Sequence, residues 1–279
     1  MAVVISMYFM KNTNFNHETR IESLLTETRL KKEEIDSSIR YASYLQESII
    51  NSGPGILELS PSSSCLNLPH DVVSGDFFVN RSLGKQQLIA AADCTGHGVP
   101  GAFVSLLAFK SVSSALEQGY IEPAELLSTV NSSLHADFNS STYSALKDGM
   151  DIGICLINPE EKTITYSNAK SYIYVLRNDG VERLNSERQS IGDVSNHPFK
   201  SWTTSYQTGD VLLLTSDGYT DQFGGPNNKK FGRRQFEEMI LEHKGLRHQS
   251  LVRVIQERLV AWKGLAEQTD DICVLVHQL

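Results

Sequence analysis

Four aspartates in this chain of 279 residues each border an apolar run typical of a buried β-strand: Asp76, Asp93, Asp217 and Asp270. Strands of one sheet can bring such ends together, so these carboxylates could meet although they are distant in sequence. Converging carboxylates without nearby Lys or Arg repel one another and raise each other's pKa values. A divalent cation removes that repulsion, and oxygen-only ligands without paired His or Cys favour Mg²⁺ or Mn²⁺ over zinc. Two such ions would activate a water and hold a phosphoryl group for in-line attack.

Each of these acids taken singly has a simpler explanation as a turn or cap residue. Asp217 is followed by Gly218, for example, and that pair alone would be an ordinary turn. The joint pattern, in which acids recur at strand ends and strand starts, is what favours a metal site.

The stretch around Asp93 indicates how one of these acids is presented. The apolar run Leu88–Ala92 precedes Asp93, and the small-residue turn Cys94–Gly98 follows it. Glycines in that turn permit backbone conformations closed to other residues and let a ligand or ion approach the backbone. A helical pattern then runs from Pro100 to about Gln118, and proline suits the first turn of a helix. The stretch predicts a strand, a turn and a helix, with Asp93 presented at a cleft.

A charged, Pro-free segment from about His17 to Ile50 predicts a helix ahead of these strands. Apolar residues follow one heptad seam with three polar interruptions: Ile21, Leu25, Ile35, Ile39, Ala42 and Ile49 on the seam, and Thr28, Lys32 and Gln46 as interruptions. Such a seam could form a dimer or pack on the domain behind it. Gly- and Pro-containing stretches after Asn51 and from Pro61 break the helix. We therefore predict a helical linker, regulatory or dimerisation segment at residues 1–50 and a separate domain at 51–279.

The domain is predicted as strands, two helices, strands, two helices and one last strand. The predicted strands are Val72–Val73, Phe77–Arg81, Gln86–Ala91, Asp151–Leu156, Lys162–Ser167, Tyr172–Arg177, Val211–Thr215 and Ile272–His277, and the predicted helices are Pro100–Gln118, Pro123–Phe138, Phe231–Glu242 and Ser250–Trp262. Turn residues between several strands predict hairpins, so we expect an α+β fold of antiparallel sheets covered by helices.

Composition restricts the partners and the compartment. The net charge of −8 argues against nucleic acid, because phosphate binding needs clustered Lys and Arg. Scattered cysteines without zinc-type spacing favour a reducing cytoplasm: Cys65, Cys94, Cys155 and Cys273. No apolar run approaches the roughly 18 residues that a membrane span needs. The N-terminal residues also lack the basic region and cleavage site of a signal peptide. We expect a cytoplasmic protein with no membrane span.

Several ordered motifs surround the four acids. They are Ser74-Gly-Asp-Phe-Phe78, Asp93-Cys-Thr-Gly-His-Gly-Val-Pro-Gly-Ala102, Thr215-Ser-Asp-Gly-Tyr-Thr-Asp221 and Asp270-Asp-Ile272, with further agreement at Lys147–Ile152, Gly209-Asp210 and Gln222–Pro226. Together they resemble the metal-dependent protein serine/threonine phosphatases (PPM, type 2C), most closely their bacterial SpoIIE-like branch. The segment Ile39–Gln46 also resembles the linker helix of such proteins, so the likeness covers roughly Ile39–Leu279. It implies a layered αββα sandwich of two antiparallel β-sheets flanked by helices and preceded by an N-terminal helix.

The resemblance also implies roles for the aspartates, which would hold two Mn²⁺ or Mg²⁺ ions. Asp93 would bridge the ions, and the backbone carbonyl of Cys94 would contact one of them. Asp217 and Asp270 would complete one site, and Asp76 would serve the other. A hydroxide bridging the ions would be the nucleophile, so catalysis would rest on Asp93, Asp217 and Asp270 without a Ser or Cys nucleophile.

Some residues depart from the family pattern. Ser74 replaces the first glycine of the usual Gly-Gly-Asp, which leaves the carboxylate in place. Lys170 stands where related phosphatases with a third metal carry an acid, which argues against a third ion. His97 lies two residues further on than the His of the eukaryotic relatives. We therefore expect His97 and Asp271 to support the site rather than bind metal. No metal-binding role is predicted for Asp148, Asp151 or Asp221.

These inferences predict a phosphatase that acts on phosphoserine or phosphothreonine in a regulatory protein, which the resemblance suggests is a STAS-type, anti-anti-sigma-like partner. The alternative is a phosphatase-fold module that holds a phosphoprotein without turnover, and the presence of all four acids favours the enzyme. A hydrolase of small phosphoesters ranks lower, because the sequence shows no P-loop-type nucleotide cradle. The N-terminal helix would regulate the enzyme or form a homodimer.

Overall fold

The computed structural model describes residues 1–51, 60–139, 148–192 and 198–279. It divides into two units, Met1–Tyr44 and Leu45–Leu279. The glycine- and proline-containing boundary expected after Asn51 lies outside the described residues, as does Lys147.

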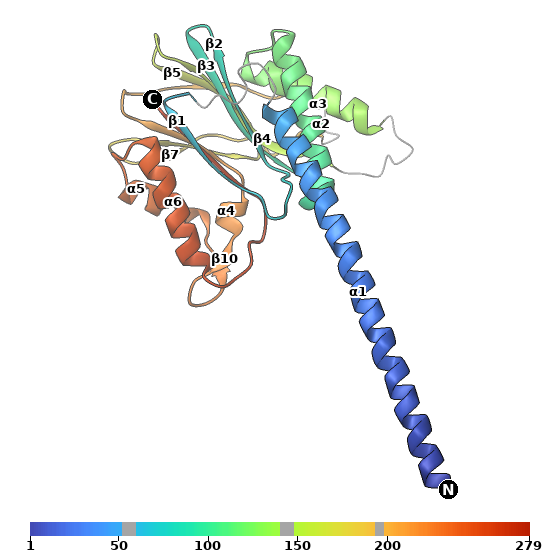
Figure 1. Ribbon diagram of the computed structural model, residues 1–279. Helices are drawn as coiled ribbons and strands as arrows, with labels where there is room; N and C mark the ends of the chain where they lie inside the picture. Colours follow the sequence, from blue (N-terminus) through green and yellow to red (C-terminus); the bar gives the residue numbers. More distant parts are fainter. Residues whose placement is uncertain (52–59, 140–147, 193–197) are drawn as a thin grey trace. The chain divides into compact units, whose positions relative to one another are not determined.

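The first unit consists of the long helix α1 (Ala2–Asn51), whose last seven residues belong to the second unit (Figure 1). It begins well before the helix predicted from His17, because no glycine or proline interrupts the chain before residue 53. Salt bridges one turn apart, Arg29–Glu33 and Lys31–Glu27, support it on the solvent side. Many apolar side chains of the helix are exposed, among them Ile21, Leu25 and Ile35.

The second unit contains two five-stranded sheets in which every neighbouring pair of strands is antiparallel. One sheet has the order β1 (Ser63–Leu68), β12 (Ile272–Gln278), β9 (Val211–Thr215), β6 (Tyr172–Leu176), β7 (Val181–Arg183). The other has the order β2 (Phe77–Leu83), β3 (Gln86–Cys94), β4 (Met150–Asn158), β5 (Thr163–Ala169), β8 (Trp202–Ser205). A small ribbon pairs β10 (Phe223–Gly224) with β11 (Lys229–Lys230).

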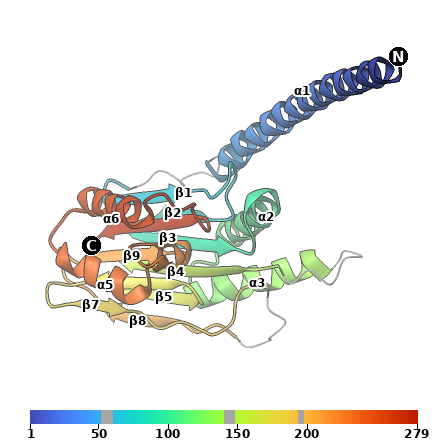
Figure 2. The same ribbon diagram turned by 90° about the horizontal axis from the view of Figure 1, so that it is seen from below.

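Helices cover the outer face of each sheet, so the predicted αββα sandwich is confirmed (Figure 2). The helices α2 (Gly98–Glu117) and α3 (Pro123–Asn139) pack on the β2–β8 sheet. The helices α5 (Arg233–Glu242) and α6 (His248–Lys263) pack on the β1–β7 sheet, and the single turn α4 (Gly218–Asp221) follows β9. A third cluster of buried apolar residues fills the space between the sheets.

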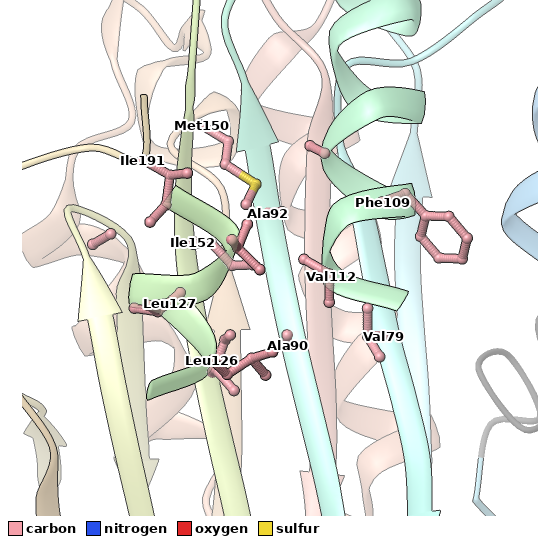
Figure 3. Packing of buried hydrophobic residues seen from close by; sticks show 14 of the residues in the cluster. Val79, Ala90, Ala92, Phe109, Val112, Leu126, Leu127, Met150, Ile152 and Ile191 are labelled. Carbon is pink, nitrogen blue, oxygen red and sulfur yellow. The ribbon is translucent and has the colours of Figure 1, made fainter. Parts of the chain in front are cut away.

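The central strand β3 explains why its sequence is a continuous apolar run. Leu88, Ala90 and Ala92 face the helices α2 and α3, whereas Ile89 and Ala91 face the other sheet. A strand buried on both faces has no polar alternation. Figure 3 shows Ala90 and Ala92 in the cluster formed with side chains of both helices, including Val112 and Leu126.

The structure corrects the predicted start of the domain. Val72–Val73 is not a strand, and the first strand is instead β1, which begins in the Ser-rich stretch interpreted as a linker. The stretch forms a strand because it pairs with β12. Ser63 lies opposite His277, and the Ser63 hydroxyl lies 2.8 Å from His277 Nδ1. The short elements β7, β8, β10, β11 and α4 were also absent from the prediction.

Gln46, a polar interruption of the heptad seam, lies in the last part of α1, which belongs to the second unit, and it forms hydrogen bonds within that unit. Gln46 is 5% exposed, and its amide nitrogen donates to the Ser74 carbonyl at 2.6 Å and to the Ser105 hydroxyl at 2.9 Å. Its amide oxygen accepts from the Ser74 backbone N–H at 3.1 Å. Gln46 therefore interrupts the seam because its side chain binds Ser74, which lies two residues before Asp76.

Within the described residues, only α2 is long and apolar enough to pass a length-and-composition test for a membrane-spanning helix. More than half of its most apolar window is buried in the domain, where it packs on β3. Its apolar content is accounted for by this packing.

Candidate active site

The acids at the strand ends meet at one edge of the sandwich. In β3 the odd-numbered residues face the space between the sheets, so Asp93 continues the face of Ile89 and Ala91. Asp217 follows β9 of the opposite sheet, and its backbone N–H points to Asp93 Oδ2 at 3.5 Å. Asp270 lies just ahead of β12, the neighbour of β9, and lines the same pocket as Asp93 and Asp217.

Two adjoining pockets open at this edge. One is lined by Asp93, Cys94, Thr95, Gly96, Asp151, Ser190, Asp217 and Asp270. The other shares three of these acids and is lined by Asp93, Asp151, Lys170, Ser171, Tyr172, Thr215, Ser216 and Asp217. Three of the four predicted acids therefore border open space, whereas Asp76 lies beneath them.

Asp76 is nearly fully buried, and its Oδ2 atom has no hydrogen-bond partner within the described part of the chain. Burial raises the pKa of Asp76 well above its usual value, and the nearby Cys273 thiol, Asp271 and Asp270 raise it further. A buried carboxylate oxygen without a partner costs free energy unless something charged binds it.

The carboxylates also perturb one another. Burial raises the pKa of Asp93 well above its usual value, and four neighbouring acids add to the shift: Asp76, Asp217, Asp270 and Asp151. The pKa of Asp217 is raised by burial first and then by Asp221 and Asp270. Where the structure describes the chain, none of the four predicted acids forms an ion pair with Lys or Arg.

These observations fit a divalent cation site. The donors are carboxylate oxygens, one of which has no hydrogen-bond partner among the described residues, and the carboxylates raise one another's pKa values. Hard cations such as Mg²⁺ and Mn²⁺ bind such oxygen ligands. Asp76, Asp93, Asp217 and Asp270 are the residues that would hold them.

Cys94 is placed for a backbone role. Its thiol is buried, and burial together with Asp93 raises the pKa of the thiol well above its usual value, so it is not an activated nucleophile. A Cβ atom built on Gly75 would lie 2.7 Å from the Gly96 carbonyl and 3.2 Å from the Cys94 carbonyl. Glycine at position 75 thus lets the segment carrying Asp76 pass directly beside these carbonyls.

The two residues expected to support the site are placed differently. Both carboxylate oxygens of Asp271 accept backbone hydrogen bonds, Oδ1 from His70 N–H and Oδ2 from Gly75 N–H, each at 2.7 Å. Asp271 therefore holds the segment leading to Asp76. His97 lines neither pocket; its Nδ1 lies 3.1 Å from Oδ2 of the exposed Asp71.

Sequence reasoning assigned no role to Asp151, which lines both pockets. Asp151 pairs with Asp93 across β3 and β4 and accepts a hydrogen bond from the Ser190 hydroxyl at 2.5 Å. Lys170, whose backbone has a φ of +54°, donates to the same Ser190 hydroxyl at 2.9 Å. Lys170 therefore lines the pocket together with Asp93, Asp151 and Asp217.

Comparison with known proteins agrees with this architecture. A profile of the SpoIIE family, described as stage II sporulation protein E, matches residues 84–279. The phosphoserine phosphatase RsbU of Bacillus subtilis (strain 168) is 22% identical over 248 residues, which is 88% of this chain and 71% of RsbU.

Solved structures are similar over most of the chain. The SiaA-PP2C domain of Pseudomonas aeruginosa has 29% sequence identity and a TM-score of 0.80, covering 89% of this chain and 98% of that domain. The PP2C phosphatase domain of SpoIIE from Bacillus subtilis, solved with a fragment of its regulatory domain, has 19% identity and a TM-score of 0.67. That comparison covers 78% of this chain and 63% of the other, and it shows a shared fold.

The family match spans well over half of the sequence and includes Asp93, Asp217 and Asp270, all at the pocket edge. This chain belongs to the SpoIIE family of PPM-type protein serine/threonine phosphatases.

Proposed function

We propose that Asp76, Asp93, Asp217 and Asp270 hold two Mn²⁺ or Mg²⁺ ions and that the site hydrolyses phosphoserine or phosphothreonine in a regulatory protein. The observation that carries this proposal is the gathering of mutually repelling carboxylates, one buried and three partly buried, that form no ion pair with Lys or Arg among the described residues. Evolution retains such a destabilising cluster where function needs it.

The side chains have separate tasks in this account. When bound, the two ions would supply a water of lowered pKa as nucleophile and would offset the charge of the phosphoryl group. Asp93, whose pKa is raised by Asp76, Asp217 and Asp270, would hold the ions together with these three carboxylates. Asp271 keeps the segment before Asp76 in place through its two backbone hydrogen bonds.

Lys170 and Asp151 define the neighbouring wall of the pocket. The Lys170–Ser190–Asp151 hydrogen bonds fix the lysine beside Asp93 and Asp217. Its positive charge opposes a third cation there and would instead attract the phosphate of the substrate. This arrangement supports a site for two ions.

The substrate proposed is a small phosphorylated regulatory protein of the STAS, anti-anti-sigma-like type. RsbU is a phosphoserine phosphatase by name, and its likeness to this chain supports phosphoserine as the group attacked. The pocket edge is strongly acidic and the chain carries a net charge of −8, so nucleic acid is an unfavourable partner. We place the reaction in the cytoplasm, since all four cysteines are free thiols.

The N-terminal helix is proposed as the regulatory or homodimerising segment, ahead of a catalytic domain at 51–279. Its exposed apolar residues, including Leu24, Leu25 and Leu30, suit a second copy of the helix. Gln46 bonds directly to Ser74, so a displacement of the helix end would reach Asp76 within two residues.

Phosphoserine-peptide hydrolysis with Mn²⁺, with a chelator and in the variant Asp217→Asn tests the function. We expect activity that requires the ion and falls by about a thousandfold in the variant, because the ion-binding carboxylate is lost. The control Asp221→Asn changes an acid four residues away that pairs with Lys230 on the surface, and it should retain activity. A folded, Mn²⁺-loaded protein that binds but never hydrolyses a phosphorylated partner would instead favour the binding-module alternative.

A further inference from the structure

Three side chains outside the carboxylate site meet beside the first turn of α2: His70, Asp71 and His97. Asp71 Oδ2 lies 3.3 Å from Nδ1 of His70 and 3.1 Å from Nδ1 of His97. One nitrogen or oxygen atom from each residue lies within 4.8 Å of the other two. Ligand atoms around a tetrahedral ion with bonds of about 2.0–2.1 Å are about 3.3 Å apart. The two separations from Asp71 Oδ2 therefore match those expected around one ion, and the histidine nitrogens lie close enough to join it after a small side-chain adjustment.

His70 supplies an unpaired ligand atom at this place. Its Nδ1 is shielded from solvent and makes no hydrogen bond with any described residue, although Asp71 lies close by. A buried polar atom without a partner calls for a water or an ion. His97, for its part, is the N-cap residue of α2 yet makes no side-chain capping bond, and its ring turns to Asp71 instead.

The backbone leaves room for this arrangement at Gly98. A Cβ atom at position 98 would lie 2.8 Å from Asp71 Oδ2, and the residue has a φ of +63°, which favours glycine. The hydrogen bond with His97 lowers the pKa of Asp71, so the carboxylate is ionised and available as a ligand. Only a residue without a side chain allows the carboxylate to approach the start of α2 this closely.

We propose that His70, Asp71 and His97 bind one transition-metal ion of the Zn²⁺ type. Two imidazole nitrogens with one carboxylate favour Zn²⁺, Co²⁺ or Ni²⁺ over Mg²⁺ and Ca²⁺, and such a set leaves a fourth position open. The site is chemically different from the all-oxygen carboxylate site, and it does not depend on the proposed phosphatase mechanism.

The ion would link the segment that leads to Asp76 to the start of α2. The His70 backbone N–H is already bound to Asp271, whose other oxygen holds Gly75. A bound ion would join α2 to this network, so we expect it to raise the thermal unfolding temperature.

The test is a titration with Zn²⁺ alone, followed by calorimetry, in a background that lacks the carboxylate site (Asp93→Asn with Asp217→Asn). We expect one Zn²⁺ per chain and a rise in unfolding temperature. Replacing His97 by Gln, or Asp71 by Asn, should weaken binding at least about tenfold and remove the rise. Co²⁺ should give the visible absorption of a low-symmetry site in the background protein and lose it in His97→Gln.

A matched control is His17→Gln, which removes an exposed imidazole from α1 and should leave Zn²⁺ binding unchanged. His70, Asp71 and His97 are all partly exposed, so the single variants should fold, which the metal-free unfolding temperature checks. The proposal is overturned if the background protein binds no Zn²⁺ at millimolar concentration, or if His97→Gln and Asp71→Asn bind it as tightly as the background. Failure here would leave the phosphatase assay unaffected.

Discussion

The strand β9 has an acid at each end, Asp210 buried before the strand and Asp217 partly buried after it, and the two acids differ in their partners. Asp210, just before the strand, is 4% exposed and accepts hydrogen bonds from Arg177 Nη1 at 3.2 Å and from the Gln207 backbone N–H at 2.9 Å. Asp217, just after the strand, has other acids as neighbours and no Lys or Arg ion partner in the described structure. Both carboxylates are at least partly shielded from solvent, but only Asp210 has a cationic hydrogen-bond partner among the described residues.

The difference separates an acid that holds the fold together from one that is available to a ligand. A buried carboxylate with a guanidinium and an amide partner has its charge compensated inside the protein. A partly buried carboxylate among other carboxylates is stabilised in its charged form when a cation binds from outside. Four predictions test this contrast, from the largest expected effect to the smallest.

The largest effect is expected for Asp93→Asn, at the centre of the uncompensated end. Turnover should fall by about a thousandfold or more, which corresponds to about 4 kcal/mol of transition-state stabilisation. The metal-free protein should nevertheless become more stable, by about 1–3 kcal/mol, because one of the mutually repelling, partly buried carboxylates is removed. Denaturant unfolding in the presence of a chelator measures the free energy of unfolding. A lower value for Asp93→Asn than for the wild type would contradict repulsion among these carboxylates.

The compensated end should respond in the opposite direction. Asp210→Asn is expected to destabilise the protein by about 2–4 kcal/mol, since the part-buried Arg177 loses its buried carboxylate partner. Glu182→Gln is the matched control, because it removes the other, more exposed acid that pairs with the same arginine. Glu182→Gln should lower the free energy of unfolding by less than about 1 kcal/mol. Equal effects of the two changes would show that burial at Asp210 has no special role.

His277 of β12 lies beside the same end of β9, where it pairs with Leu212 and contacts the Ser63 hydroxyl. Burial lowers the pKa of His277 from 6.5 to about 4. Between these values the unfolded chain binds more protons than the folded one, so stability falls as the pH drops from about 6.5 to about 4. The loss from this group is of the order of 2–3 kcal/mol. His277→Gln should flatten that part of the stability–pH curve, and an unchanged slope would refute the assignment.

The smallest effect is expected for Lys170, the cation at the wall of the pocket. Lys170→Ala should lower kcat/KM for a phosphopeptide by about tenfold, or about 1.4 kcal/mol, mainly through KM, because an attraction for the phosphate is lost. Lys170→Arg should retain part of the kcat/KM that Lys170→Ala loses. A larger metal stoichiometry in Lys170→Asp than in the wild type would show that the lysine keeps a third ion out.

The positions of the site acids relative to the strands could be predicted from the sequence, because they depend on local patterns. Acids that border apolar runs identified Asp76, Asp93 and Asp217, and the runs themselves identified the central strands. The Ser-rich strand β1 was missed because its partners are supplied by β12, more than two hundred residues away.

Features that depend on register or on distant contacts could not be predicted. Asp151 joins the site because β4 pairs with β3 in a register that places it opposite Asp93, with two helices intervening in the chain. Asp71 and His97 meet only because the segment before β2 returns to the start of α2. The partner of Asp210, Arg177, lies 33 residues away and likewise follows from sheet pairing.

The most direct test of the central claim is the number of Mn²⁺ ions bound at the uncompensated end of β9, measured by electron paramagnetic resonance. The His97→Gln background removes any contribution from the imidazole cluster. We predict two bound Mn²⁺ ions with the spectrum of a coupled pair, and loss of that coupling in Asp93→Asn. A protein that binds no Mn²⁺ at millimolar concentration, or binds it equally after Asp93→Asn, would contradict the assignment of these carboxylates as the metal site.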